Sequence, residues 1–226
     1  MPKIFGFYQI KKGGKALVAG LIVMALMCGS AVYVNATAKL KPIYEVETDE
    51  KVVALTFDIS WGNVTPLPVI DILKEQGVRS TMFLSGPWVK QYPEIPQRLV
   101  EDGHEIASHG YRHINLSELG AAEIQEEVQK AHNNIKEVTG VEPNLIRTPN
   151  GDYNDVVVKA IRDMGYEVIQ WSVDSLDWMN PGVDTIIERV TQKVHPGAII
   201  LMHASDTCKQ TAEALPAVIQ SLKEQG

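Results

Sequence analysis

From Val52 onward, short apolar runs rich in β-branched residues alternate with amphipathic segments, and glycines separate the two kinds of segment. This alternation is typical of a parallel sheet, open or closed into a barrel, whose strands are joined by helices. In such folds the side chains that carry function lie at the carboxyl ends of the strands. The predicted strands are Val52–Phe57, Ser80–Leu84, His104–Ala107, Leu145–Arg147, Glu167–Trp171 and Ala198–Met202.

The clearest predicted helix spans Ala121–Thr139, where apolar residues recur every three or four positions and Gly140 then ends the pattern. Other predicted helices lead through a glycine directly into a strand, at Gly77, Gly103 and Gly165. The sequence stops at Gly226 in the same kind of junction. We therefore expect one more apolar strand, absent from this sequence, beside Val52–Phe57.

The first 43 residues differ from the rest because they hold six lysines and no acidic residue. Within them, Ala16–Val34 carries no charge and would span about 28 Å as a helix, at ~1.5 Å per residue, enough to enter or cross a membrane. Two alternatives stay open: a signal peptide cleaved near Ala36-Thr37-Ala38, or an uncleaved anchor. In both, the lysines stay inside and one domain over residues 44–226 lies outside the cytoplasm.

Charge and cysteine content exclude several classes of function. The formal net charge is −7 at pH 7, which argues against a nucleic-acid partner because phosphate binding needs a basic surface. Of the two cysteines, Cys28 lies in the apolar leader and Cys208 near the end, so neither a disulfide framework nor a CxxC zinc site can be built. Any metal would therefore be held by histidine and carboxylate.

Polar residues follow five of the predicted strands. Singly, each has a structural explanation, because an aspartate after a strand is more often a helix cap than a catalytic group. His109 and His113 are more specific, since a spacing of four puts both imidazoles on one side of a helical turn, within reach of one ion. Because strand ends converge on one barrel mouth, the set predicts a single site. The residues are Asp58, His109, His113, Arg147, Asp174, Asp177 and His203.

In order and spacing, five motifs resemble those of the NodB-type polysaccharide deacetylases, carbohydrate esterase family 4. They are TFD at 56–58, SHGYRH at 108–113, RTPNG at 147–151, DSLDW at 174–178 and LMH at 201–203. The resemblance covers roughly Val52 to Leu222 and is closest to the sporulation-associated PdaB type. It implies a distorted (β/α) barrel of about seven strands that removes N-acetyl groups from peptidoglycan or chitin-like sugars with the help of a metal.

The resemblance also implies roles for the residues at the strand ends. Asp58 would be the general base, with Arg147 orienting its carboxylate and forming an ion pair with it. His203 would protonate the leaving amine, and Asp174 would hold the imidazole of His203. Both roles suit amide hydrolysis, which needs a base on one side of the carbonyl and an acid on the other.

The metal and substrate contacts are implied in the same way. His109 and His113 would bind the metal, usually zinc in this family, and the backbone N–H of Asn150 would help to bind the oxyanion. Leu201 would line the slot for the acetyl methyl group, and Trp178 would form its wall.

The sequence departs from the family at Ile59, where the first motif usually has a second aspartate that completes the metal ligands. Isoleucine binds no metal, so we expect a core side chain at this position and a site with only two protein ligands. Two hypotheses follow: a deacetylase with a weakened or rearranged zinc site, in which Asp58 is drawn into coordination, or a glycan-binding relative without catalysis.

The remaining expectations concern partners and location. We expect a polysaccharide ligand of peptidoglycan or N-acetylglucosamine type, contact with a membrane through residues 1–43, no nucleic acid, and a monomer. The domain would be exported, either secreted or anchored, with the spore envelope as one destination.

Overall fold

The computed structural model describes residues 40–226. The predicted signal or anchor segment lies almost entirely before this range, as do the Ala36-Thr37-Ala38 site and Cys28, so these predictions fall outside the described residues. Among residues 40–226, no helix combines the length and the apolar character that crossing a membrane requires.

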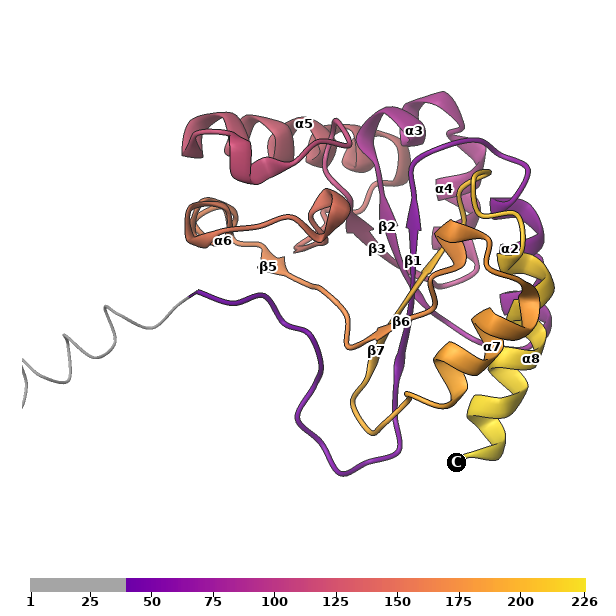
Figure 1. Ribbon diagram of the computed structural model, residues 1–226. Coiled ribbons are helices and arrows are strands. Elements are labelled where there is room, and N and C mark those ends of the chain that lie inside the picture. The colour runs from indigo at the N-terminus through magenta and orange to yellow at the C-terminus, as the bar shows by residue number, and fades with distance from the viewer. Residues whose placement is uncertain (1–39) are drawn as a thin grey trace, which may run out of the picture. The chain divides into compact units, whose positions relative to one another are not determined.

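Seven parallel strands form one sheet in the order β5-β4-β3-β2-β1-β7-β6 (Figure 1). This confirms the predicted fold class, and the six predicted strands are all present with ends shifted by a few residues. The sequence analysis missed β6, which has only two residues. The strands are β1 Ala54–Ile59, β2 Thr81–Leu84, β3 Glu105–Ser108, β4 Leu145–Ile146, β5 Glu167–Val168, β6 Val173–Asp174 and β7 Ile199–His203.

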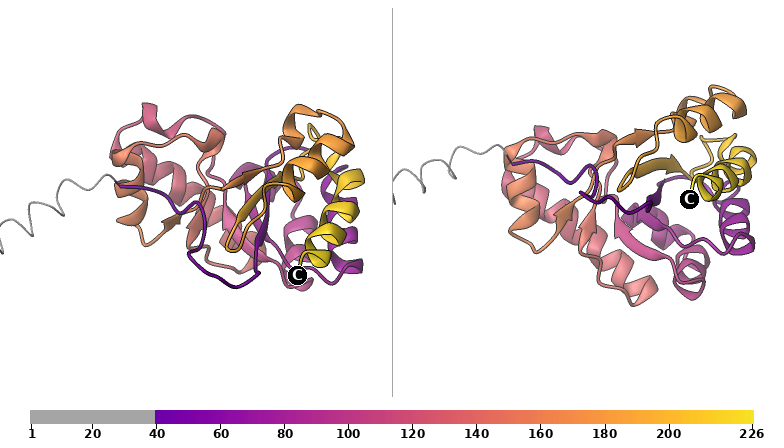
Figure 2. Two further views of the ribbon diagram at one scale, coloured as in Figure 1. Left: turned by 60° about the horizontal axis from the view of Figure 1, so that its bottom comes forward. Right: turned by 90° about the horizontal axis from the view of Figure 1, so that it is seen from below.

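The sheet curls so far that its two edge strands, β5 and β6, approach each other (Figure 2). Only residues 169–172 separate them in the chain. At one end of this crossing, Ile169 N–H donates to the carbonyl of Ile146 in β4, and at the other Ser172 N–H donates to the carbonyl of Ile199 in β7. A four-residue link can span opposite edges only because the sheet is bent into a distorted barrel.

Helices cover the outer face of the curled sheet (Figures 1 and 2). The longest, α5, has the predicted bounds Ala121–Thr139 and ends at Gly140, whose φ of 74° is the left-handed conformation that suits glycine. The other helices are α2 Pro66–Glu75, α3 Gly86–Gln91, α4 Glu94–Glu101, α6 Asp155–Arg162, α7 Val183–Thr191 and α8 Thr211–Glu224. Short 3-10 turns are η1 Leu116–Glu118, η2 Pro149–Gly151 and η3 Asp177–Met179.

The alternation of side chains along β1 separates the core between sheet and helices from the barrel interior. Leu55, Phe57 and Ile59 belong to the largest hydrophobic cluster, which joins the sheet to the helices α2, α3, α4, α7 and α8. Ala54 packs instead with the smaller interior cluster around Phe83. Since successive strand residues point to opposite faces, Asp58 also faces the interior.

We predicted a further strand, following the last helix, that would pair with Val52–Phe57. The predicted position of that strand is wrong. Strand β1 pairs with β2 on one side and with β7 on the other, so neither edge of it is free. After α8, the chain instead returns to the start of β1, where Lys51 Nζ donates to the carbonyl of Gln225 at 2.7 Å.

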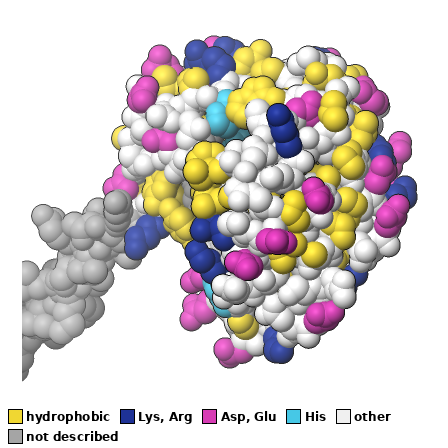
Figure 3. Space-filling view, turned by 45° about the vertical axis from the view of Figure 1, so that its right-hand side comes forward, with side chains coloured by type: hydrophobic (Ala, Val, Ile, Leu, Met, Phe, Trp, Pro, Cys, Tyr) yellow, Lys and Arg dark blue, Asp and Glu magenta, His cyan; other side chains and the backbone are white. Residues whose placement is uncertain are grey.

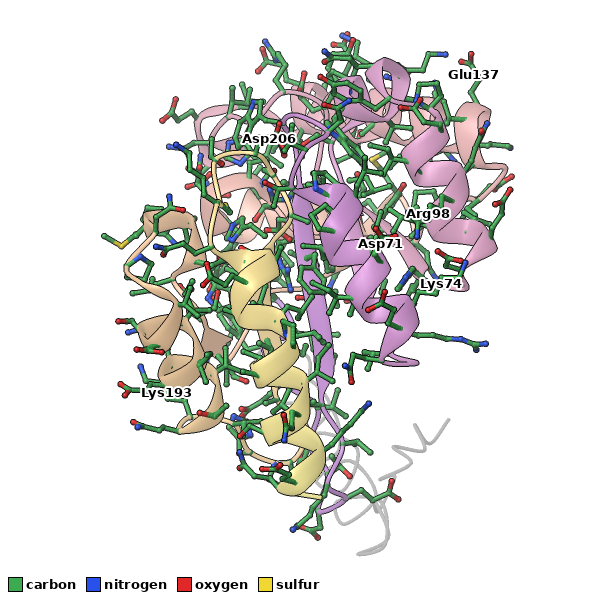
Figure 4. All side chains as sticks on the ribbon, turned by 90° about the vertical axis from the view of Figure 1, so that its right-hand side faces the viewer. Asp71, Lys74, Arg98, Glu137, Lys193 and Asp206 are labelled. Atoms are coloured by element: carbon green, nitrogen blue, oxygen red, sulfur yellow. The ribbon has the colours of Figure 1, made fainter. Side chains whose placement is uncertain are left out.

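Ion pairs on the outer surface tie neighbouring helices together. Arg98 of α4 donates to Asp71 of α2 at 2.6 Å, and Lys74 of α2 donates to Asp102 at 2.6 Å (Figure 4). On the face of the described domain in Figure 3, acidic and basic side chains are interspersed, without one continuous patch of either sign.

Candidate active site

A cavity of about 460 Å³ opens at the carboxyl ends of the strands. All the predicted site residues except Arg147 and Asp177 line it, so the structure gathers motifs that lie up to 145 residues apart in the chain. Its lining residues are Asp58, Trp61, His109, His113, Asn150, Gly151, Trp171, Asp174, Trp178, Leu201, His203, Ser205, Thr207 and Cys208.

Asp58, at the end of β1, is paired with Arg147 below the cavity floor. Arg147 NH1 donates to Asp58 Oδ1 at 2.7 Å, and its NH2 donates to the carbonyl of Gln170 at 3.0 Å. The guanidinium is fully buried and lies over the ring of Phe83 at 4.2 Å. Burial by itself raises the pKa of Asp58, but the charges of Arg147 and the nearby histidines outweigh it and lower the pKa. Asp58 is therefore a fixed carboxylate at neutral pH.

His109 presents one ring nitrogen to Asp58. Its Nδ1 lies 3.0 Å from the carbonyl of Arg147, to which only a protonated nitrogen can donate. Nε2 then carries the lone pair and lies 3.7 Å from Asp58 Oδ2. Burial lowers the pKa of His109 to about 4, so the ring is neutral at pH 7, the form that binds metals.

His113 lies beside His109, with their ring centroids 5.2 Å apart in an edge-on arrangement. The turn between them contains Gly110 at a φ of 75°, a conformation that a larger side chain would strain. Burial lowers the pKa of His113 as well. The predicted pair of neutral imidazoles thus comes together on one wall of the cavity.

The side-chain atoms in this part of the cavity are of the types that bind zinc, because imidazole nitrogens and carboxylate oxygens are its usual ligands in catalytic sites. Two ligand atoms on one tetrahedral zinc ion are about 3.4 Å apart, close to the separation of Asp58 Oδ2 and His109 Nε2. Ile59 contributes nothing, because its side chain is fully buried on the helix-covered face. His109 and His113 would hold the ion, and Asp58 is the carboxylate that lies beside His109.

His203 is held by Asp177, and the prediction that Asp174 holds it is wrong. His203 Nδ1 donates to Asp177 Oδ1 at 2.7 Å, and the His203 N–H donates to Asp177 Oδ2 at 2.8 Å. The carboxylate of Asp174 accepts instead from the N–H of Leu176 at 2.8 Å. The physical reason is the turn at Leu176, whose left-handed φ of 56° directs the chain so that Asp177 is fully buried behind His203.

Asp177, His203 and Cys208 also offer atoms within 4.8 Å of one another, a spacing that a metal could use. The ligand atoms of Asp177 and His203 are already engaged in hydrogen bonds, however, because Asp177 accepts from His203 and from Thr211 Oγ1, each at 2.7 Å. Burial raises the pKa of the Cys208 thiol to about 12, so it is not a thiolate at neutral pH. We therefore interpret the group as a hydrogen-bonded support for His203.

The sequence analysis missed Trp61 and Trp171 as cavity residues. Trp61 lies only three positions after Asp58. An aromatic side chain directly after the end of a strand could have identified it as a cavity residue. Trp171 lies in the crossing between the edge strands, and a Cβ on Gly151 would come within 2.8 Å of its ring. The close packing of Gly151 on Trp171 explains why this turn needs glycine.

The chain matches known proteins along most of the described domain. The family model for polysaccharide deacetylase matches residues 45–169. The chain is 34% identical to the uncharacterised protein YlxY of Bacillus subtilis, with 82% of this chain and 57% of that protein covered. It is also 34% identical to the peptidoglycan-N-acetylmuramic acid deacetylase PdaA of B. subtilis, with 83% and 72% covered. The match to YlxY thus spans little more than half of that protein.

Solved structures agree with these matches. A mutant of a family 4 carbohydrate esterase pseudoenzyme from Bacillus anthracis, described as having restored enzymatic activity, superposes with a TM-score of 0.78 at 39% identity, covering 82% of this chain and 67% of that one. The structure of B. subtilis PdaA gives a TM-score of 0.76 at 34% identity, covering 82% and 80%. From motifs, fold and matches together, the chain belongs to the polysaccharide deacetylase family, carbohydrate esterase family 4.

Proposed function

We propose that this protein removes N-acetyl groups from amino sugars of a cell-wall polysaccharide, either peptidoglycan or a chitin-like polymer. The observation that carries this proposal is the pairing of two oriented groups in one cavity. Asp58, held by Arg147, and His203, held by Asp177, face the same space from adjacent strands, where they are register partners. The names of relatives that act on peptidoglycan-N-acetylglucosamine and on chitooligosaccharide support the substrate class.

Asp58 serves as the general base in this proposal. Its lowered pKa keeps it ionised, and Oδ2, on the side away from Arg147, is the oxygen that takes a proton from the attacking water. The water oxygen then forms a bond to the carbonyl carbon of the acetyl group. Arg147 keeps the carboxylate from turning away, since its own position is fixed by the carbonyl of Gln170.

His203 serves as the general acid. Burial disfavours its charged form, but the hydrogen bond and the charge of Asp177 outweigh burial and raise its pKa. Because Nδ1 is held by Asp177, Nε2 is the atom that gives a proton to the amide nitrogen as the C–N bond breaks. The products are acetate and a free amine on the sugar.

The remaining cavity residues would position the substrate. His109 and His113 would hold a divalent metal, which would supply Lewis-acid polarisation of the acetyl carbonyl. Asn150, through its backbone N–H, would donate to the oxyanion, and Leu201 and Trp178 would enclose the acetyl methyl group; all three line the cavity.

Acetate release tests this function. The purified protein, with zinc and other divalent ions added in turn, would be incubated with N-acetylglucosamine oligomers and with peptidoglycan. We expect acetate release that His203→Ala and Asp58→Asn abolish. A protein that binds these glycans but releases no acetate with any metal would overturn the catalytic proposal.

The second candidate is a glycan-binding protein without catalysis. Ile59 favours it, because the metal site then has one protein ligand fewer than zinc normally requires. The wild-type protein from B. anthracis, a pseudoenzyme of the same family at 38% identity, supports this candidate as a similar chain that is described as lacking activity. Binding without acetate release is the result that would select this candidate.

We also propose that the domain is exported and acts as a monomer at the cell envelope, in line with a PdaB-type role in spore formation. In residues 1–43, lysines come before an uncharged apolar segment. This order supports export, because lysines in that position stay in the cytoplasm. A reporter fused after residue 60 would test it. Activity of a periplasm-type reporter is expected, and activity of a cytoplasmic one would contradict export.

A further inference from the structure

The four tryptophans of the chain fall into two groups. Trp88 belongs to the main hydrophobic cluster, and Trp171 packs against the interior one. Trp61 and Trp178 belong to none of the clusters in the described domain, and 48% and 51% of their surfaces are exposed. Both line the cavity. Half-exposed indoles contribute little to folding, so a binding role is the simplest physical reason for them.

The loop that carries Trp61 is held rigidly by the segment after β7. The carboxylate of Asp206 accepts three backbone hydrogen bonds, from Asn63, Val64 and Thr65, at 2.8–3.2 Å. The Asp206 N–H in turn donates to the carbonyl of Trp61 at 3.0 Å. Figure 4 shows Asp206 on its loop at the upper end of the sheet.

A second anchor comes from the core. Trp88 Nε1 donates to the carbonyl of Gly62 at 2.6 Å, which ties the loop to helix α3. Gly62 itself lies against the Asp206 carboxylate, so closely that a Cβ would be 2.0 Å from Oδ2. A rigid loop presents its exposed side chain without a further loss of conformational entropy on binding.

The position of Trp61 relates it to the reactive groups. Its ring centroid lies 4.7 Å from that of His113, and the two planes are inclined by 51°. A ligand resting on the exposed part of the indole therefore lies beside the imidazoles of His113 and His109. Trp178, on the turn after β6, is the other half-exposed indole lining the cavity.

We propose that Trp61 is a stacking platform for a pyranose ring of the N-acetylated glycan, and that it fixes the chain beside the reacting sugar. The inference rests on the proposed glycan ligand but holds for either candidate function. A pyranose has a face of C–H groups with partial positive charge, which complements the electron-rich face of an indole. The flat, rigid surface next to His113 suits such a ring better than it suits a flexible ligand.

Binding measurements test the proposal. The dissociation constant of an N-acetylglucosamine tetramer would be measured by calorimetry for the full chain, Trp61→Ala, Trp61→Phe and Val64→Ala. We expect Trp61→Ala to weaken binding about tenfold or more and Trp61→Phe, which keeps an aromatic face, to weaken it less than about threefold. Val64→Ala is the matched control, because Val64 lies on the same loop, is 72% exposed and does not line the cavity.

A measurement on the unmodified protein guards against misfolded variants. In a spectrum of the protein with labelled indole nitrogens, the Trp61 signal should shift on titration with the tetramer while the buried Trp88 signal stays in place. Equal binding by the wild type and Trp61→Ala, or an unmoved Trp61 signal during saturable binding, would overturn this inference alone. Absence of glycan binding by the wild type would overturn the proposed function together with it.

Discussion

The Nδ1 atom of His203 lies 2.7 Å from Asp177 Oδ1, and the same carboxylate accepts the backbone N–H of His203 through its other oxygen. One buried acid thus fixes both the ring and the backbone of the histidine. A third hydrogen bond, from Thr211 Oγ1, holds the acid itself. This arrangement makes Asp177 a positioning residue for His203, the proposed proton donor.

Replacing Asp177 with asparagine should lower the pKa of His203. The hydrogen bond and charge of Asp177 raise that pKa against the effect of burial, and asparagine removes the charge. The pKa can be followed by the imidazole resonances of His203 between pH 5 and 9. Asp174→Asn is the matched control, because within residues 40–226 the carboxylate of Asp174 accepts only from the N–H of Leu176, so the substitution should leave the histidine unchanged. An equal shift in both variants would show that net charge alone, and not this contact, sets the pKa.

The same variant makes a prediction about stability. A histidine whose folded pKa is raised stabilises the fold fully below its unfolded pKa of about 6.5, and this contribution is lost as pH rises through the folded value. The free energy of unfolding of Asp177→Asn should therefore fall furthest below the wild type at pH 6 and less at pH 9. Urea unfolding at both pH values measures the difference.

Removing the arginine below the cavity should destabilise the protein strongly. Arg147→Met leaves the carboxylate of Asp58 buried without its partner, which typically costs about 3–5 kcal/mol. Arg98→Met is the control: Arg98 pairs with Asp71 and Asp102, but its side chain is partly exposed, and a solvent-exposed ion pair is worth about 1 kcal/mol or less. Urea unfolding at pH 7 compares the two. Similar losses in both would mean that the Asp58–Arg147 pair is not desolvated as its burial indicates.

Acid should destabilise the fold partly through His109. With a folded pKa of about 4 and an ordinary value near 6.5, the unfolded chain takes up a proton first as pH falls, so stability decreases below pH 6.5. Between pH 7 and 5 the loss attributable to this residue is about 2 kcal/mol. In chelator-treated samples, His109→Asn should show a shallower decrease by that amount. A decrease as steep as the wild type's would place the responsible group elsewhere.

A carboxylate at position 59 should destabilise the protein without improving zinc binding. In Ile59→Asp the new carboxylate enters a fully buried position on the helix-covered face, so without metal we expect a loss of at least about 3 kcal/mol of unfolding free energy. With excess zinc, the variant should gain no more stability than the wild type, because this side chain points away from the cavity; a gain larger by about 2–3 kcal/mol, as a hundredfold tighter site would give, would show that the new carboxylate reaches the metal. Thermal melting with and without zinc measures both effects.

The zinc affinity of the wild type separates a site with two protein ligands from a site with three. If the wild type already binds zinc tightly, Asp58 must provide the third ligand, since its Oδ2 lies 3.7 Å from His109 Nε2. Asp58→Asn would then abolish zinc binding, as measured by titration, whereas under the two-ligand hypothesis zinc binding is weak in both proteins.

Sequence reasoning recovered the parts of this fold that local patterns control. The apolar repeat of Ala121–Thr139 and the glycines after helices mark elements whose stability depends on neighbours in the chain, and α5 has the predicted bounds. It missed β6 because Val173–Asp174 is too short for a pattern and exists only through pairing with β7. Long-range pairing of that kind leaves no trace in local sequence.

The site divides in the same way. Strand ends in a parallel barrel meet at one mouth, so the convergence of Asp58, His109 and His203 followed from their places in the sequence. The sequence did not predict that Asp177, and not Asp174, holds His203. That choice depends on the left-handed backbone conformation of Leu176, which its residue type does not indicate. Residues three apart in a motif can exchange roles when a turn between them changes direction.

The pairing of β1 with β7 has a consequence for how the protein matures. Asp58 and His203 are register partners on the adjacent strands β1 and β7, although 145 residues separate them in the chain. Closing so long a loop is slow, and strands that wait for a distant partner expose their edges meanwhile. If the domain is exported as proposed, a chain that crosses the membrane from its N-terminus would keep Asp58 and His203 apart until nearly all of it had emerged. The candidate site would then form last, outside the cytoplasm.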